Sequence, residues 1–284
     1  MKAVIPAAGL GSRFLPATKA QAKEMLPIVD KPAIQYIVEE ALAFGADEVV
    51  VVNSRGKKSL EDHFSPNPAL VAELRGRGKD RYADAVERAG ELPVSFVYQD
   101  EPLGLGHAVH VAAPVTGEEP FMVMLGDVLV PGNGVCQRMV EVSRQHGGAS
   151  VIAVAPVPDE EVSRFGIVGG KDVGEGVWKL DTMVEKPALE DAPSNLSIFG
   201  RYLLTPAVMD LLAETGPGAG GEIQLTDALV ALLGREDVYA LVIDGSEGFD
   251  TGTVPSWIAA NVALGMRDPK TAAYLKEAVG GLFA

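Results

Sequence analysis

The chain begins with a short apolar run that leads directly into a glycine-rich loop: Met1-Lys2-Ala3-Val4-Ile5-Pro6-Ala7-Ala8-Gly9-Leu10-Gly11-Ser12-Arg13. A short run rich in apolar and β-branched residues predicts a buried strand at Ala3–Pro6. The small residues that follow allow backbone N–H groups to come close to the phosphates or the base of a ligand. This stretch is therefore a candidate ligand loop at the end of a strand.

Four more short apolar runs resemble that first strand, at Val49–Val52, Val94–Tyr98, Phe121–Leu125 and Val151–Ala155. Segments with helical spacing lie between the strands, most clearly at Ala33–Phe44 and His107–Ala113. Strands that alternate with helices are typical of a mainly parallel sheet with helices on both faces. We therefore predict an α/β fold that is doubly wound and Rossmann-like.

The pattern changes after about residue 160. Three strand-like runs joined by short turns lie at Ile167–Val168, Val177–Val184 and Leu196–Leu204, and helices are predicted at Pro206–Glu214, Glu222–Leu233, Val254–Leu264 and Lys270–Val279. Short turns predict an antiparallel insertion or second lobe, which makes the sheet mixed. Because no repeat or long linker divides the chain, we expect one domain over 1–284, with parts at 1–155, 156–252 and 253–284.

Composition limits the class of protein and its location. Apolar residues make up 47% and charged residues 22% of the 284 residues, the mixture of a globular chain with a packed core. Cys136 is the one cysteine, which excludes an internal disulfide and a Cys-rich metal centre. The sequence has neither a long uncharged apolar run nor the apolar start of a signal peptide. We therefore expect a cytoplasmic protein without a membrane partner.

Charge is distributed unevenly. The net charge of −15 excludes nucleic acid as a bulk partner, because such binding needs Lys and Arg to neutralise phosphates. Residues 1–31 nevertheless carry five basic side chains against two acidic ones. This local excess predicts a small anionic ligand near the N-terminus, and a chance grouping of lysines is the alternative.

Two common phosphate-binding motifs fit the loop poorly. A Walker loop would end in Gly-Lys-Ser/Thr, which is absent, and Phe14 stands where the dinucleotide fingerprint has its third glycine. Asp30 lies at the distance of a ribose-binding carboxylate, but Pro16 and Pro27 interrupt the intervening segment. A dehydrogenase is therefore a weak alternative.

The sequel of the loop carries a clearer resemblance. Arg13 follows the glycines, and Lys23 comes ten residues later, just before Leu26-Pro27. With this pattern the chain resembles the nucleotide-sugar pyrophosphorylases, and Leu26–Pro32 together with Gly104-Leu105-Gly106-His107-Ala108 is similar to the branch that uses UTP. A guanidinium and an ammonium suit a triphosphate clamp, because the first binds phosphate oxygens in pairs and the second acts as a point charge. The resemblance thus gives Arg13 and Lys23 a catalytic role.

The resemblance also implies a nucleotide site. Its predicted residues are Ala8, Gly9, Gly11, Gln99 and Gly104. In the family, the residue at Gln99 reads the uracil edge, and the glycine at Gly104 lies against the base. An amide suits uracil because it both donates and accepts hydrogen bonds. We interpret His107 as a helix-start residue without a chemical role.

Two aspartates are implied as metal ligands. Asp127 follows the strand Phe121–Leu125, at the carboxyl edge where open α/β sheets bind ligands, and Asp250 lies in Gly248-Phe249-Asp250-Thr251-Gly252-Thr253. The family pairs the two carboxylates around Mg²⁺, which takes one or two protein carboxylates and completes its shell with water and phosphate oxygens. Taken alone, an aspartate at a strand end is more often a turn former.

The sugar side is implied by Phe165-Gly166-Ile167 and Glu185-Lys186-Pro187. In the family, the equivalents of Gly166 and Glu185 bind the sugar, and the equivalent of Lys186 binds the sugar phosphate and takes part in catalysis. A carboxylate that binds two vicinal hydroxyls orients a sugar through charge-assisted hydrogen bonds. Without the resemblance, Glu185 and Lys186 would read as a surface ion pair.

Three positions depart from the family pattern, namely Ser12, Ala22 and Gly126. None of them removes a charged group, but Gly126-Asp127 is also similar to thymidylyl relatives, so the base preference stays open. The resemblance implies an enzyme that makes UDP-glucose and pyrophosphate from UTP and glucose 1-phosphate by Mg²⁺-assisted in-line attack. The alternatives are the same chemistry with another nucleotide or sugar, and a non-catalytic nucleotide-sugar sensor. Relatives form dimers or tetramers, so a homodimer or homotetramer is expected.

Overall fold

The computed structural model describes residues 1–132 and 134–280. Its main elements up to residue 156 are β1 (Lys2–Pro6), α1 (Ala33–Ala43), β4 (Glu48–Asn53), α2 (Lys58–Phe64), α3 (Pro68–Gly76), α4 (Asp80–Gly90), β5 (Val94–Tyr98), α5 (Leu105–Val111), α6 (Ala113–Thr116), β6 (Phe121–Met124), α7 (Val135–Gln145) and β8 (Ser150–Pro156). Those after it are β9 (Gly166–Gly174), β10 (Val177–Glu185), β11 (Leu196–Leu204), α8 (Ala207–Glu214), α9 (Leu225–Leu233), β12 (Val238–Val242), α10 (Val254–Gly265) and α11 (Pro269–Gly280).

Short elements complete the chain. Two-residue strands are β2 (Pro27–Ile28), β3 (Lys31–Pro32), β7 (Val128–Leu129) and β13 (Phe249–Asp250). The short 3₁₀ helices are η1 (Ser12–Phe14), η2 (Ala17–Lys19), η3 (Lys23–Met25), η4 (Asp159–Arg164), η5 (Leu189–Asp191), η6 (Ala219–Gly221) and η7 (Gly245–Glu247). The two smallest ladders, β2 with β3 and β7 with β13, lie outside the main sheet.

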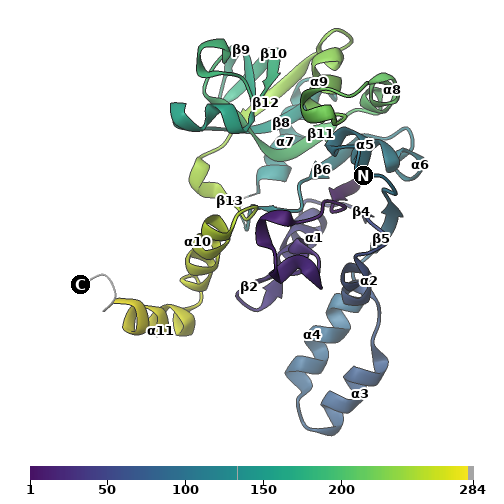
Figure 1. The fold of residues 1–284 in the computed structure, drawn as a ribbon, viewed down its shortest axis with the longest axis vertical. Coiled ribbons are helices and arrows are strands. Elements are labelled where there is room, and N and C mark those ends of the chain that lie inside the picture. Colours follow the sequence, from purple (N-terminus) through teal and green to yellow (C-terminus); the bar gives the residue numbers. More distant parts are fainter. Residues whose placement is uncertain (133, 281–284) are drawn as a thin grey trace.

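One nine-stranded sheet organises the molecule, in the order β5-β4-β1-β6-β11-β8-β12-β10-β9 (Figure 1). The strands β5, β4, β1 and β6 are parallel, and so are β8 and β12, whereas β11 is antiparallel to β6 and β8 on its two sides. Strand β11 therefore joins the parallel first half of the sheet to the mixed second half.

Successive residues of the strands point to opposite faces, and each face is covered by helices. In β1, Ala3 and Ile5 pack in the cluster that contains α1 and α7, whereas Val4 packs in the cluster that contains α5, α8 and α9. Ala3, Val4 and Ile5 are completely buried. Burial on both faces explains why the strands read as continuous apolar runs, as expected for parallel strands between helical layers.

The predicted fold class is confirmed: the sheet is mixed, helices lie on both faces, and helices close the described chain. The five predicted strands of the first half and the antiparallel strands all form. The antiparallel strands join the main sheet itself. Helix α9 begins at Leu225, three residues later than predicted, because Gln224 is extended and the backbone of Ile223 bonds to Leu103 and Gly106.

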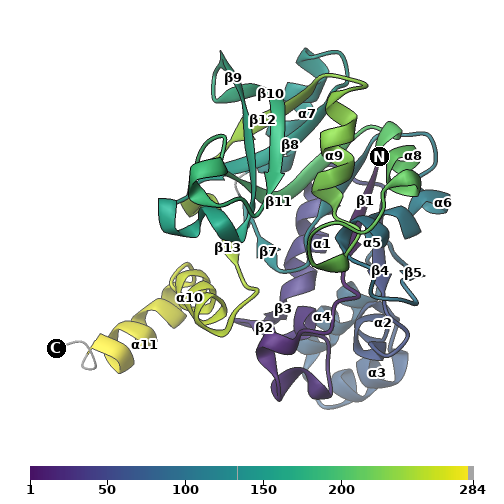
Figure 2. The ribbon, with the colours of Figure 1, turned by 45° about the horizontal axis from the view of Figure 1, so that its top comes forward.

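Two parts extend away from the sheet. The α3–α4 hairpin projects at one end in Figure 1, and helices α10 and α11 project to the side in both Figure 1 and Figure 2. Helix α3 has no buried residue, which agrees with its charged sequence. The predicted C-terminal helices are α10 and α11, and residues 281–284 of that predicted part lie outside the described residues.

Candidate active site

A cavity of about 520 Å³ opens at the carboxyl ends of β1, β5 and β6. Nine of the predicted site residues line it, namely Ala8, Gly9, Arg13, Lys23, Gln99, Gly104, Asp127, Glu185 and Lys186. They come from the first ligand loop, η3, the start of α5, and the ends of β5, β6 and β10. The carboxyl edge of the parallel strands is where open α/β sheets bind ligands, so the topology alone favours this cavity as the site.

The loop between β1 and η1 has one glycine that packs against another segment and one that faces open space. Gly11 has φ +64°, and a Cβ there would lie 3.1 Å from Cβ of Lys23. Thr18 Oγ1 donates to the carbonyl of Gly11 at 2.8 Å, which holds the turn. Around Gly9, by contrast, no atom lies within 4 Å of a built Cβ, so its exposed face is open to a ligand. Gly11 thus packs the loop against the lysine segment.

Lys23 is the partly buried cation of the pair that the sequence predicts. Its Nζ lies 2.6 Å from Oδ2 of Asp127. Burial lowers the pKa of Lys23, but the carboxylates of Asp127 and Glu24 outweigh burial, so the pKa lies above its usual value. Arg13 is exposed in η1 and, among residues 1–132 and 134–280, has no ion pair. One cation is therefore held by a carboxylate, and the other is available to an anion.

Asp127 and Asp250 are 123 positions apart in the sequence, but a short ladder brings them together. Strand β13 pairs with β7 so that Asp250 stands opposite Val128, the neighbour of Asp127. The backbone N–H and the hydroxyl of Thr251 both donate to the carbonyl of Asp127, at 2.7 and 2.9 Å. The two aspartates therefore lie next to each other, beside the cavity that Asp127 lines.

Gly252 marks the point of convergence. A Cβ at Gly252 would lie 2.9 Å from Oδ1 of Asp250 and 3.2 Å from Oδ2 of Asp127. The same position is 3.7 Å from Nη1 of Arg13. The guanidinium and the two carboxylates thus surround one backbone position, and a side chain there would push them apart. The N–H of Gly252 also donates to Oδ1 of Asp250 at 2.6 Å, which orients that carboxylate.

Strand β10 ends at Glu185, and Lys186 follows it; both residues line the same cavity. Gly166 stands opposite Glu185 in the β9–β10 ladder, and a Cβ at Gly166 would lie 3.1 Å from Oε2 of Glu185. Thr226 donates its hydroxyl to that same oxygen at 2.7 Å, and Lys186 Nζ lies 3.1 Å from Oε1. Lys186 has φ +48°, and its N–H donates to the carbonyl of Phe165 at 3.0 Å. Thr226 is a positioning residue that sequence reasoning missed.

Gln99 lies just beyond the end of β5 and is 6% exposed. Its side-chain nitrogen is 3.1 Å from the carbonyl oxygen of Gly104 and 3.0 Å from Nδ1 of His107. His107, interpreted from the sequence as having no chemical role, therefore contacts a predicted nucleotide-binding residue. The spacing of eight residues between them gave no signal, because their contact depends on the turn at Gly104.

Sequence reasoning also missed a buried ion pair beneath the loop. Lys57 Nζ lies 3.0 Å from Oε2 of Glu24 and donates to the carbonyl of Ala7 at 2.6 Å. The side chains are 12% and 1% exposed. Burial raises the pKa of Glu24 against the pull of Lys57, and burial lowers the pKa of Lys57. The pair ties the start of the ligand loop to the segment that carries Lys23.

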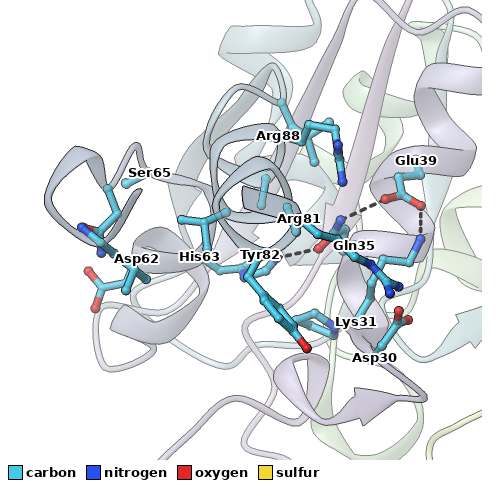
Figure 3. A pocket seen from close by; sticks show the side chains of 17 residues that line it. Asp30, Lys31, Gln35, Glu39, Asp62, His63, Ser65, Arg81, Tyr82 and Arg88 are labelled. Atoms are coloured by element: carbon cyan, nitrogen blue, oxygen red, sulfur yellow. Dashed lines mark hydrogen bonds and ion pairs between the residues drawn. The ribbon is translucent and has the colours of Figure 1, made fainter. Parts of the chain in front are cut away.

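A second cavity, of about 720 Å³, lies between α1, the end of α2, and α4 (Figure 3). It contains none of the predicted site residues. Much of its polar wall is bonded internally: Gln35 donates to Glu39 and bonds to His63, and Lys31 pairs with Glu39. The larger cavity therefore lacks the predicted site residues and the glycine loop of the smaller one.

The described residues contain no helix long and apolar enough to span a membrane. The family model described as "Nucleotidyl transferase" matches residues 2–266. UTP–glucose-1-phosphate uridylyltransferase of Streptococcus pneumoniae is 46% identical over 283 residues, covering 97% of this chain and 94% of the relative. The enzyme of the same name from Pseudomonas aeruginosa is 45% identical over 263 residues, covering 91% and 94%.

Two solved structures agree with these relatives. A UDP-glucose pyrophosphorylase complexed with UDP-glucose superposes with a TM-score of 0.83 at 40% identity, over 94% of this chain and 99% of that one. The UTP-bound enzyme of Acinetobacter baumannii gives a TM-score of 0.88 at 39% identity, over 97% of each chain. The resemblance inferred from the loop and the Arg13–Lys23 segment is confirmed, and the chain belongs to the UTP–glucose-1-phosphate uridylyltransferases of the nucleotidyl transferase family.

Proposed function

We propose that this protein joins UTP and glucose 1-phosphate to form UDP-glucose and pyrophosphate. The observation that carries the proposal is the convergence of Arg13, Asp127 and Asp250 around Gly252, next to a cavity that the glycine loop, Glu185 and Lys186 also line. The glycine loop and Arg13 suit a triphosphate, and Glu185 with Lys186 suits a sugar phosphate. Relatives that are named for this reaction, one of them UTP-bound, support the assignment.

The two aspartates suit a divalent cation. Their carboxylate oxygens both lie beside Gly252, and hard oxygen donors are what Mg²⁺ prefers, with water and phosphate oxygens completing its shell. We propose that Asp127 and Asp250 would hold Mg²⁺, which when bound would neutralise phosphate charge. Nζ of Lys23 bonds to the carboxylate of Asp127, so an ammonium lies next to the proposed cation site.

The protein's own cations would then bring two anions together. Arg13, which pairs with no carboxylate in the described chain, is free to bind triphosphate oxygens. Lys23 packs against Gly11 of the same loop. Glu185, oriented by Thr226, would accept hydrogen bonds from sugar hydroxyls, and Lys186 would bind the sugar phosphate. Catalysis would rest on positioning and on charge neutralisation.

The reaction does not call for a general base. A phosphate monoester has a second pKa near ~6, so the attacking oxygen of glucose 1-phosphate is already ionised at neutral pH. That oxygen would attack the α-phosphorus of UTP in line with the departing pyrophosphate. Within this proposal, residues 1–155 supply the nucleotide side, and residues 156–252 supply the sugar side and the second carboxylate.

A pyrophosphate-release assay with UTP, glucose 1-phosphate and Mg²⁺ tests the proposal. Parallel reactions with dTTP, CTP and ATP measure the base preference, which Gly126 leaves open at the level of sequence. We expect turnover with UTP that disappears when a chelator removes the divalent cation. Tight binding of UDP-glucose without turnover would instead indicate a nucleotide-sugar sensor and would refute the enzymatic proposal.

We also propose that the protein works in the cytoplasm as a homodimer or homotetramer. The projecting helix α10 and its C-cap expose apolar side chains four residues apart: Val254, Ile258 and Val262 in the helix and Met266 at the C-cap are 43, 50, 48 and 38% exposed. Such a stripe is typical of a surface that a partner covers. Light scattering on the full chain tests the assembly, and a monomer would refute this part of the proposal.

A further inference from the structure

The amide of Gln99 is held from two sides. Its nitrogen lies 3.1 Å from the carbonyl oxygen of Gly104 and 3.0 Å from Nδ1 of His107. A backbone carbonyl oxygen can only accept a hydrogen bond, so the atom beside it must be the amide nitrogen. The second N–H of that nitrogen then points to His107, whose Nδ1 must be the unprotonated, accepting ring nitrogen. Both N–H groups of Gln99 are therefore used within the protein.

The carbonyl that orients Gln99 is itself fixed. Gly104 has φ +111°, and a Cβ there would lie 2.7 Å from the carbonyl oxygen of Ile223, so only glycine fits without a shift. The N–H of Ile223 donates to the carbonyl of Leu103 at 2.7 Å, and the N–H of Gly106 donates to the carbonyl of Ile223 at 2.8 Å. These bonds hold both sides of Gly104.

The position of His107 is fixed by the same turn. Helix α5 begins at Leu105, immediately after Gly104, so His107 lies in its first turn. Ala108 N–H donates to the carbonyl of Gly104 at 3.1 Å, which closes that turn. The backbone of Gln99 is also held, because its main-chain N–H donates to the carbonyl of Asn53 at 2.9 Å. The Gln99 amide, the Gly104 carbonyl and the His107 ring therefore keep a fixed geometry.

We propose that His107 is a positioning residue that makes Gln99 an obligate acceptor and thereby selects the base. The inference rests on the proposed function, in which Gln99 meets the edge of the nucleotide base. With both N–H groups used, Gln99 presents only its oxygen to a ligand. That oxygen accepts a hydrogen bond from N3–H of uracil, whereas cytosine has a lone pair at N3 and would be repelled.

This arrangement corrects the sequence-based interpretation that the Gln99 amide both donates to and accepts from uracil, because the donating half is bonded to Gly104 and His107. It also defines what the amide does not distinguish. Thymine has the same N3–H and neighbouring carbonyls as uracil, so this contact does not reject dTTP. The selection is between pyrimidines that carry N3–H and those that do not.

Two substitutions of His107 distinguish the effect of its accepting nitrogen from the effect of the size of its ring. His107→Leu removes the acceptor, which frees one N–H of Gln99 in a site that is almost completely buried. His107→Asn keeps an accepting oxygen near the place of Nδ1. A matched control is His63→Leu, since Nε2 of His63 lies 3.0 Å from Oε1 of Gln35 in the second cavity (Figure 3). It removes a similar His–Gln contact away from the candidate active site.

The measurement is kcat/KM for UTP and for CTP at saturating glucose 1-phosphate. In His107→Leu we expect kcat/KM for UTP to fall about tenfold and the preference for UTP over CTP to fall about tenfold, the scale of one lost hydrogen bond at a buried group. His107→Asn and His63→Leu should keep the preference of the unmodified protein. The loss should appear mainly in KM for UTP, because His107 acts on the base and not on the phosphates.

A preference that stays within about twofold in His107→Leu overturns the proposal, and so does a His107→Asn variant that behaves like His107→Leu. Nitrogen NMR of the unmodified protein gives a test that needs no variant: Nδ1 of His107 should be unprotonated, and a protonated Nδ1 overturns the proposal. Failure of the proposed function is distinguishable, since the unmodified protein would then not turn over UTP at all.

Discussion

Nζ of Lys23 lies 2.6 Å from Oδ2 of Asp127, so a predicted phosphate-binding cation is bonded to a predicted metal ligand. The contact joins residues 104 positions apart in the sequence. Burial lowers the pKa of Lys23, but the carboxylates of Asp127 and Glu24 outweigh burial and raise it, so the contact favours the charged lysine. The predicted phosphate-binding lysine and the proposed metal ligand are therefore one electrostatic unit.

Asp127→Ala should reduce turnover by at least about a hundredfold, the scale of losing a preorganised electrostatic group. The substitution removes a proposed metal ligand and also deprives Lys23 of its partner. Pyrophosphate release at saturating substrates is the measurement. Asp62→Ala is the control, because Asp62 pairs with Lys58 at the surface and should leave turnover unchanged. Near-normal activity of purified Asp127→Ala would contradict the proposed role.

Lys186→Ala should lower kcat by at least about a hundredfold while changing KM for UTP little, because the lost ammonium is assigned to the sugar phosphate. Lys179 lies on β10, the strand that ends just before Lys186, and pairs with Asp237 at the surface, so Lys179→Ala is a matched control. Steady-state kinetics with each substrate varied in turn would show the difference. An equal loss of UTP affinity in Lys186→Ala would place the lysine on the nucleotide side instead.

Thr226→Val should raise KM for glucose 1-phosphate about tenfold, since the substitution removes the hydroxyl that orients Oε2 of Glu185. Thr226→Ser keeps that hydroxyl and should restore the KM. KM for UTP should not change in either variant. If both variants behave alike, the hydroxyl of Thr226 does not orient Glu185 for the sugar.

Lys57→Met should lower the free energy of unfolding by about 3–5 kcal/mol, because it leaves the carboxylate of Glu24 buried without its partner. Urea denaturation of the full chain is the measurement. The neighbouring Lys58 provides the control, as it is exposed and pairs with exposed Asp62, so Lys58→Met should leave the urea midpoint almost unchanged. Equal effects of the two substitutions would show that the buried pair does not contribute in this way.

Tyr36 should lose its proton only at an unusually high pH. Burial, followed by the nearby carboxylates of Asp30 and Glu39, raises its pKa from 10.0 to about 12. The folded state therefore favours the neutral phenol, and the stability that Tyr36 contributes is complete below pH 10 and is lost as pH rises through about 12. The phenolate absorbance that Tyr36→Phe removes should appear only near the higher value. Titration at the ordinary pKa would contradict this.

The strands that are buried on both faces could be predicted from the sequence, because burial requires a continuous run of apolar residues. Ala3–Pro6 and Val49–Val52 are apolar throughout because both faces of β1 and β4 are covered, and that pattern needs no knowledge of distant contacts. Strand β12 and helix α7 were not predicted. Val238–Val242 is similar in composition to the other strands, but it lies among predicted helices, and its place in the sheet depends on pairing with β8.

The site was less predictable from the residues alone. Asp250 is not recognisable as a neighbour of Asp127 without the family resemblance, because the β7–β13 ladder that joins them has only two residues in each strand. Lys57, Thr226 and His107 were missed because each acts through a hydrogen bond to another side chain. Such contacts depend on tertiary packing, for which a single sequence has no periodic signal.

Strand β11 pairs with β6 on one side and with β8 on the other, although it follows both of them in the chain. The edges of β6 and β8 that pair with β11 therefore stay open during synthesis until residue 204 has left the ribosome. The other edge of β8 stays open longer, because its partner β12 ends at Val242. Open strand edges promote aggregation, so the nascent chain carries this risk until β12 completes the sheet.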